Sequence, residues 1–246
     1  MRRAYIPRRR HVHSTSDVDG VNTALGYWGP LSYPMRARLH MVVRSLERRR
    51  GFARILDAGY GGGILLPDLY RRLGPGGHLF GVDVHGEHRG VYERLVGGEG
   101  MDRHRVHLLQ ASLAALPFPD AWFDLVVSVS VLEHIPPALL PACLGEIRRV
   151  ARPGAQIALG FPTDGWFIRV LSWVQGNDLK ANHPSTHRDI LRTIRAGGLR
   201  ILEERHFPCL SRGPLVMHYN VRVAPPEAPV GGAHGSVEAR GKGEGT

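Results

Sequence analysis

Short apolar runs and segments of helical periodicity alternate along most of this 246-residue chain. The apolar runs have strand length and stand at 53–58, 78–84, 105–111, 123–131 and 155–161. Segments with helical spacing separate them, at 65–73, 87–96 and 136–150. Continuous apolar strands are typical of a parallel sheet whose two faces are both covered. The pattern therefore predicts an α/β fold: a Rossmann-like, doubly wound, mostly parallel sheet with helices on both faces.

Further elements are predicted on either side of this alternation. A helix is expected at 35–50, where Leu39, Val42, Val43 and Leu46 repeat at helical spacing. After the fifth strand we expect a helix at 188–196 and strands at 199–207 and 215–223. If the last two strands pair as a hairpin, the sheet has about seven strands and its last one is antiparallel.

Composition shifts divide the chain into one domain with two tails. Residues 1–20 are basic without periodicity, and 224–246 are rich in Pro and Gly, so both are expected to be disordered. The domain itself is predicted at 21–223. Its parts are an N-terminal lid segment at 21–50, a core at 51–161, a substrate-side insertion at 162–187, and the C-terminal helix and strands at 188–223.

The formal net charge of +10 raises the question of nucleic-acid binding. Nearly all basic residues are arginines scattered over predicted helix faces, which indicates a solvated surface, so a nucleic-acid partner is not expected. No apolar run reaches the roughly 18 residues of a membrane span, and no signal-peptide core follows the basic first residues. We therefore expect a cytoplasmic protein without a transmembrane segment. Two cysteines form neither a disulfide framework nor a zinc pattern.

A glycine-rich turn follows the first predicted strand, in the sequence ILDAGYGGG at 55–63. Such a turn between a strand and a helix is typical of a nucleotide cradle, and Asp83 at the end of the next strand is placed to accept ribose hydroxyls. The nicotinamide fingerprint requires a third glycine where Ile64 stands. Asp57 would also fit poorly beside a pyrophosphate. An acid before the loop suits a ligand with a cationic amino group, which favours S-adenosylmethionine (SAM) over NAD.

Four segments in this order resemble the class I SAM-dependent methyltransferases, in particular the methyltransferase type 11 and ubiquinone/menaquinone-biosynthesis group. They are ILDAGYGGG, GVDVH at 81–85, ALPFPDAWFDLVVSVSVLEHI at 115–135, and RVARPGAQIAL at 149–159. The resemblance covers about 55–161. It implies a SAM-dependent enzyme whose cofactor lies across the carboxyl ends of the first strands.

The resemblance also implies a role for individual residues. Asp57 and the Gly59–Gly63 loop would hold the methionine end, Asp83 the ribose, and Val84 the adenine ring. Ser112 stands where many relatives carry an adenine-binding Asp, and the end of the fourth strand would lie beside the sulfonium. The cofactor-binding residues expected on this basis are Asp57, Gly59, Tyr60, Gly61, Gly63, Asp83, Val84, Ser112, Leu113, Ser128, Val129 and Ser130.

Histidines supply the candidates for acid/base chemistry, because imidazole titrates near neutral pH. His134 in LEHI is either a proton-transfer residue or a positioning residue beside the cofactor. His183 and His187, in NHPSTH, stand where the acceptor is expected. Two histidines without a third ligand do not make a metal site, so none is expected; substrate contact, or helix capping by Ser185 and Thr186, is favoured. Tyr27, Trp28 and Tyr33 form either an aromatic lid or ordinary core.

Methyl transfer from a sulfonium needs alignment more than acid/base catalysis, so the lack of a catalytic triad does not argue against activity. The expected function is methyl transfer by in-line displacement to a small-molecule or lipid-like acceptor, with oxygen favoured and carbon or nitrogen open. Two alternatives remain: a non-catalytic subunit that binds SAM or a partner, and an RNA-directed methyltransferase.

Overall fold

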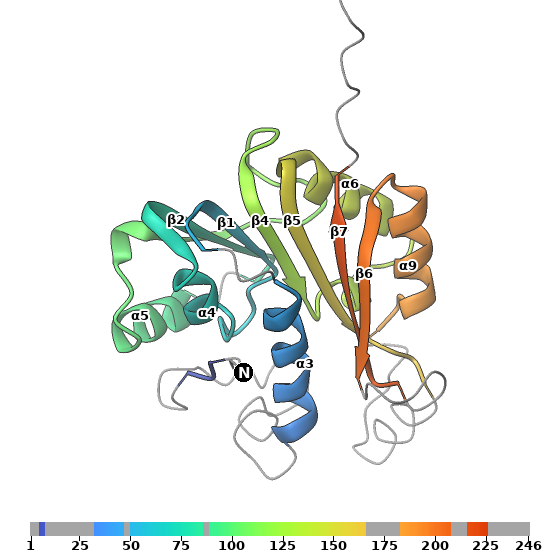
Figure 1. Cartoon of the computed structure of the whole chain (residues 1–246), viewed down its shortest axis with the longest axis horizontal. Helices are drawn as coiled ribbons and strands as arrows, with labels where there is room; N and C mark the ends of the chain where they lie inside the picture. Colours follow the sequence, from blue (N-terminus) through green and yellow to red (C-terminus); the bar gives the residue numbers. More distant parts are fainter. Residues whose placement is uncertain are drawn as a thin grey trace, which may run out of the picture.

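The structure of the protein is a computed structural model, which describes residues 5–7, 32–46, 50–85, 89–165, 183–207 and 216–225. Seven strands form one sheet in the order β3-β2-β1-β4-β5-β7-β6 (Figure 1). The strands are β1 (Phe52–Ala58), β2 (Leu73–Asp83), β3 (Val106–Gln110), β4 (Phe123–Val129), β5 (Ala151–Pro162), β6 (Arg200–Phe207) and β7 (His218–Ala224). The first five pair in parallel, and β7 pairs antiparallel with both β5 and β6. The predicted mixed α/β sheet with an antiparallel last strand is confirmed.

Helices cover both faces of this sheet, and a separate hydrophobic core lies between the helices and the sheet on each face (Figure 1). The helices are α3 (Ser32–Ser45), α4 (Leu66–Tyr70), α5 (Arg89–Gly98), α6 (Leu140–Val150) and α9 (His187–Ala196). Side chains of α3, α4 and α5 pack into one core, and those of α6 and α9 into the other. The apolar repeat predicted at the start of the domain is the buried face of α3, where Val42 is completely buried.

The first crossover departs from the expected boundaries. The helix predicted at 65–73 covers only Leu66–Tyr70, and the glycine-rich segment at 74–77 that follows it lies inside β2. Pairing between β1 and β2 joins Phe52 to Leu73 and resumes at Arg54 with His78, so the intervening residues of β2 bulge. A Cβ on Gly77 would lie 2.5 Å from the Phe52 carbonyl oxygen, so this close approach requires glycine.

The segment before α6 also differs from the prediction of a helix beginning at Pro136. A short 3-10 helix, η4 (Leu132–His134), follows β4, and α6 begins only at Leu140. A second 3-10 helix, η3 (Arg103–Arg105), precedes β3. The consequence for the site is that the LEHI sequence forms a tight turn directly at the carboxyl end of β4.

Two residues of the N-terminal segment that was expected to be disordered pack on the domain. The Tyr5 backbone N–H donates to Asp68 Oδ2 at 2.6 Å, the Arg71 guanidinium lies 3.8 Å from the Tyr5 ring centroid, and Ile6 packs against the α3–α5 core. The rest of the arm, the predicted lid residues Tyr27 and Trp28, most of the 162–187 insertion, and the tail from residue 226 lie outside the described residues. Within the described ranges, no helix has the length and apolarity needed to cross a membrane.

Candidate cofactor and acceptor site

The glycine loop leaves β1 and turns back against β2. The Gly59 N–H donates to the Val82 carbonyl oxygen at 2.8 Å. At φ +89° a Cβ on Gly59 would lie 2.2 Å from a Val131 methyl carbon, so the loop packs directly on the residue that precedes η4. Gly61 has φ +48° and no atom within 4 Å of a Cβ built on it, so this part of the loop borders open space. A ligand could therefore approach the backbone at Gly61.

Asp83 joins the loop to the end of β2. Its Oδ2 accepts from the Gly61 N–H and its Oδ1 accepts from the His85 N–H, each at 3.0 Å. Only 8% of Asp83 is exposed, whereas the next residue, Val84, is 53% exposed. An ordered carboxylate therefore stands beside an exposed apolar side chain at the rim of the loop.

Asp57 lies on β1 under the loop, with 2% of its surface exposed. Burial, and then the charge of Asp83, raise the pKa of Asp57 from 3.8 to about 7. A carboxyl group in this environment gains stability from a proton or from a nearby cation. The position predicted to face a ligand's amino group thus has the electrostatic character that this role requires.

The remaining predicted cofactor residues differ in exposure. Ser112 is exposed and its Oγ accepts from the Ala114 N–H at 3.2 Å, while the Leu113 side chain is buried in the α6–α9 core. At the end of β4, Ser128 is completely buried and its Oγ has no partner among the described atoms. Val129 and Ser130 are half-buried. Val129 and Ser130, rather than the Ser128 side chain, are therefore the residues at the end of β4 that a ligand could reach.

Ser130 connects this strand end to α3. It has φ +56°, an uncommon conformation for a residue other than glycine, and its Oγ accepts a hydrogen bond from Arg38 Nη1. Arg38 is only 8% exposed. Arg38 carries no functional signal in the sequence, because one arginine among many on a helix resembles a surface residue until the fold shows which face it occupies.

Two more buried polar residues stand under α3 on β7. Burial, and then the charge of Arg38, lower the pKa of His218 to about 3, so this imidazole is neutral. Asn220 is 1% exposed and neither its Oδ1 nor its Nδ2 has a partner among the described residues. Asn220 is opposite Gly160 in the β5–β7 register, and a Cβ on Gly160 would contact Val42 of α3. Polar groups therefore line the sheet beneath α3, which lies within the predicted lid segment.

His134 and His183 come together, and they meet a residue that was not predicted. Their ring centroids lie 4.9 Å apart at 80°, and the candidate ligand atoms of Glu133, His134 and His183 all lie within 4.8 Å of one another. Glu133 is 2% exposed, and burial raises the pKa of its carboxyl, an effect partly offset by His134. The sequence signal that could have identified Glu133 is its position next to His134 in LEHI.

His187 lies apart from this group. Its Nδ1 contacts Asp164 Oδ1, and its ring stacks on Tyr219 with centroids 5.4 Å apart. Thr186 caps α9 through a capping box with Asp189, as favoured for this residue. Ser185 does not cap the helix; its Oγ donates to the Ile135 carbonyl oxygen at 2.5 Å.

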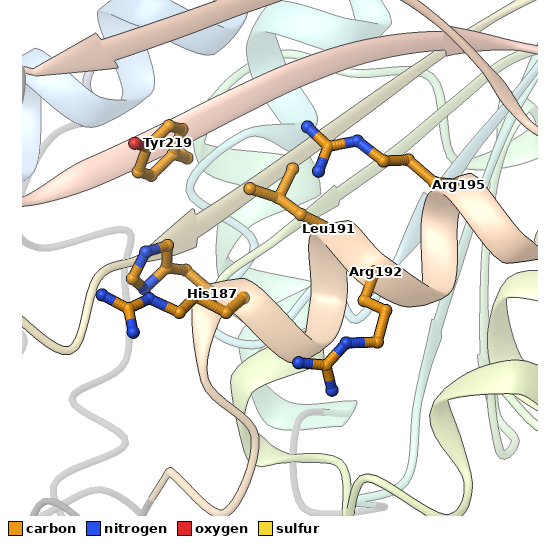
Figure 2. A pocket seen from close by; sticks show the side chains of 6 residues that line it. His187, Leu191, Arg192, Arg195 and Tyr219 are labelled. Carbon is orange, nitrogen blue, oxygen red and sulfur yellow. The ribbon is translucent and has the colours of Figure 1, made fainter.

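A shallow hollow lies over α9 and β7 (Figure 2). It is lined by His187, Arg188, Leu191, Arg192, Arg195 and Tyr219. Arg192 pairs with Asp189 and Arg195 with Glu204, each at 3.2 Å. In the sheet order β4 and β5 separate β7 from β1, so this hollow is distinct from the glycine loop.

Comparison with known proteins identifies the core. Residues 55–154 match a family model described as a methyltransferase domain. This core therefore resembles a methyltransferase domain. It contains the glycine loop, Asp57, Asp83 and the LEHI turn. The described tertiary structure agrees: a SAM-dependent methyltransferase from Methanosarcina mazei has the same fold, with a TM-score of 0.60 over 76% of this chain and 98% of its own, at 18% sequence identity.

Two curated relatives of this core are named as methyltransferases of quinones or of their biosynthesis. A ubiquinone biosynthesis O-methyltransferase of Hahella chejuensis is 38% identical over 109 residues, which are 42% of this chain and 41% of that protein. A demethylmenaquinone methyltransferase of Thermus thermophilus is 32% identical over 145 residues, which are 58% of this chain and 60% of that protein. The chain thus matches about two-fifths to three-fifths of the length of these relatives.

Proposed function

We propose that this protein is a SAM-dependent methyltransferase acting on a small or lipid-like acceptor, with an oxygen atom as the favoured methyl acceptor. The observation that carries the proposal is the joint arrangement of an open glycine loop, the ordered Asp83 carboxylate and the buried Asp57. The quinone-biosynthesis relatives support a small, partly apolar acceptor, and one of them is named as an O-methyltransferase.

The described residues fit the three chemical parts of SAM. Asp57 provides a carboxyl whose raised pKa a bound ammonium group would lower. Asp83 retains lone pairs beyond the two backbone hydrogen bonds it accepts, so it can also take ribose hydroxyls. Val84 offers an exposed apolar surface for a planar ring. When bound, the cofactor would supply an electrophilic methyl group on a sulfonium.

The protein's own contribution to catalysis is orientation of the acceptor beside the end of β4. Ser130 and Arg38 are tied together at this strand end, and Arg38 places a positive charge there. A positive charge favours an acceptor oxygen that has lost its proton, which is the stronger nucleophile. Alignment and exclusion of water then suffice for an in-line displacement.

Transfer of labelled methyl groups tests this function. Purified protein would be incubated with SAM labelled on its methyl group and with matched acceptors that bear a phenolic hydroxyl, an activated ring carbon or an amine. We expect label in the phenolic acceptors, with Arg38→Gln slowing the reaction at least tenfold. Label in the carbon or amine acceptors would replace the oxygen assignment. SAM binding without transfer to any acceptor would favour the non-catalytic alternative.

A further inference from the structure

Glu133, His134 and His183 form a cluster at the carboxyl end of β4. The segments that carry them are fastened together: the Ser185 N–H donates to the Glu133 carbonyl oxygen at 3.2 Å, and Ser185 Oγ donates to the Ile135 carbonyl oxygen. Ser185 is itself 3% exposed. The backbone thus holds His183, from the segment before α9, beside the turn that carries the other two residues.

The buried Glu133 carboxyl is only partly satisfied: Ser130 hydrogen-bonds to it, but one of its two oxygens has no partner in the described part of the chain. Glu133 Oε2 is shielded from solvent and has no hydrogen-bond partner among the described residues, although Glu133 is 2% exposed. Leaving such an oxygen unpartnered is costly. The two imidazole rings beside it are less buried, His183 half-buried and His134 exposed, so the cluster is open on one side.

We propose that Glu133, His134 and His183 bind one divalent transition-metal ion. Ligand atoms that each lie about 2.1 Å from one ion are at most about 4.2 Å apart. The observed separations, up to 4.8 Å, exceed this limit only slightly, so small side-chain rotations would bring the three ligand atoms within reach of one ion. Two imidazole nitrogens and one carboxylate oxygen favour Zn²⁺, Mn²⁺ or Co²⁺ over Mg²⁺, which prefers oxygen ligands.

Three protein ligands leave coordination positions open for water or for an acceptor oxygen. The site adjoins Ser130, which has Arg38 as its hydrogen-bond donor. Arg38 also acts electrostatically on Glu133, so an added divalent ion makes the site strongly positive. Such a site selects an acceptor that brings negative charge, and an oxyanion flanked by a second oxygen can chelate the ion.

This assignment of the substrate class rests on the proposed function. The acceptor hydroxyl would lose its proton to solvent, and its oxygen lone pair would form the new bond to the methyl carbon. The sulfur–methyl bond would break with its electron pair remaining on sulfur, which converts the sulfonium into a neutral thioether. We therefore expect acceptors with vicinal oxygens, such as catechols, to react faster than matched monophenols.

Metal titration of the tag-free full chain, after treatment with a chelator, tests the site directly. Co²⁺ reports its coordination by visible absorption, and Zn²⁺ and Mg²⁺ would be titrated by calorimetry. The variants are Glu133→Gln, which keeps the shape of the side chain, and His183→Ala. His104→Ala, an exposed histidine of η3, is the matched control. Circular dichroism would establish that each variant is folded.

We expect one Co²⁺ or Zn²⁺ per chain, and Mg²⁺ binding at least 100-fold weaker. Each cluster variant should weaken Zn²⁺ binding at least tenfold, with the control within twofold of wild type. If Glu133→Gln does not fold, His183→Ala decides. Equal Zn²⁺ affinity of wild type and His183→Ala would overturn the site. SAM binding to the metal-free protein is measured in parallel: SAM binding without a metal site would overturn only this inference, and a metal site without SAM binding would overturn only the proposed function.

Discussion

Protonation of Asp57 should make SAM binding depend on pH. The carboxyl is buried, and its pKa is raised from 3.8 to about 7. That difference means that the carboxylate form is destabilised by roughly 4 kcal/mol relative to an exposed carboxylate. A bound ammonium group would lower the pKa of Asp57 again. Below pH 7, binding must therefore release the proton that Asp57 carries.

The pKa of Asp57 also sets the size of the expected pH dependence. With a pKa of about 7 in the free protein, binding should release close to one proton at pH 6 and roughly half a proton at pH 7. The association constant should rise by up to about tenfold for each pH unit below 7 and level off above it. The pH range in which Asp57 alone controls SAM binding ends near pH 7.5, because an α-amino group itself loses its proton at about pH 8.

Calorimetry in buffers with different ionisation enthalpies measures the released proton. S-adenosylhomocysteine keeps the amino group but lacks the sulfonium, so it should show the same pH dependence as SAM. Asp57→Asn should bind both ligands more weakly at pH 7.5 and release no proton. A flat affinity between pH 5.5 and 7 for wild type, or an unchanged slope in Asp57→Asn, would refute the pairing of Asp57 with the amino group.

The raised pKa of Asp57 also predicts how the stability of the free protein changes with pH. A raised carboxyl pKa means that the folded state binds the proton more tightly than the unfolded state. The resulting stabilisation is complete below pH 3.8 and is lost as the pH rises through about 7. Urea denaturation of Asp57→Asn should therefore show a smaller loss of stability between pH 5 and 8 than wild type.

Three further predictions concern the loop, the sheet and the end of β4. Gly61→Ala and Gly154→Ala should each cost about 1 kcal/mol of stability, because both positions have positive φ. Only Gly61→Ala should also weaken SAM binding, by at least tenfold. Equal SAM affinities of the two variants would contradict a ligand at the loop. Asp124→Ala should lower the free energy of unfolding by about 2–4 kcal/mol, because this buried carboxylate accepts hydrogen bonds from two backbone N–H groups of β1. As a control, Asp120→Ala, which removes an exposed carboxylate, should cost under about 1 kcal/mol. Ser130→Gly should be more stable than Ser130→Ala by about 1 kcal/mol in urea denaturation, since only glycine relieves the strain at φ +56°; the reverse order would show that this backbone is unstrained.

The parts of the fold that follow from local pattern were predictable from the sequence. Alternating strands and helices, and the apolar face of α3, are set by periodicity, and the structure confirms them. Boundaries were less predictable where tertiary contacts decide them. The glycine-rich segment after α4 resembles a loop, yet the close approach of Phe52 holds it in β2. The packing of Tyr5 on Asp68 and Arg71 likewise leaves no local pattern.

The residues of the candidate site also differ in whether the sequence alone could predict them. Asp57 and Asp83 were identifiable because they flank one short loop and the strand beside it. Arg38, His218 and Asn220 come from segments far apart in the sequence, and only the sheet order brings them to one face. The Glu133 cluster needs two segments about 50 residues apart, joined by a single buried serine. No spacing rule within one segment reveals such a combination.

Binding of SAM to the purified protein tests the central claim most directly. Calorimetric titration with SAM and S-adenosylhomocysteine would compare wild type with Asp83→Ala and with Asp102→Ala, which removes a carboxylate that caps η3 away from the site. The account predicts micromolar binding of both ligands by wild type and Asp102→Ala, and at least a hundredfold loss in Asp83→Ala. Folded wild-type protein that binds neither ligand would contradict it.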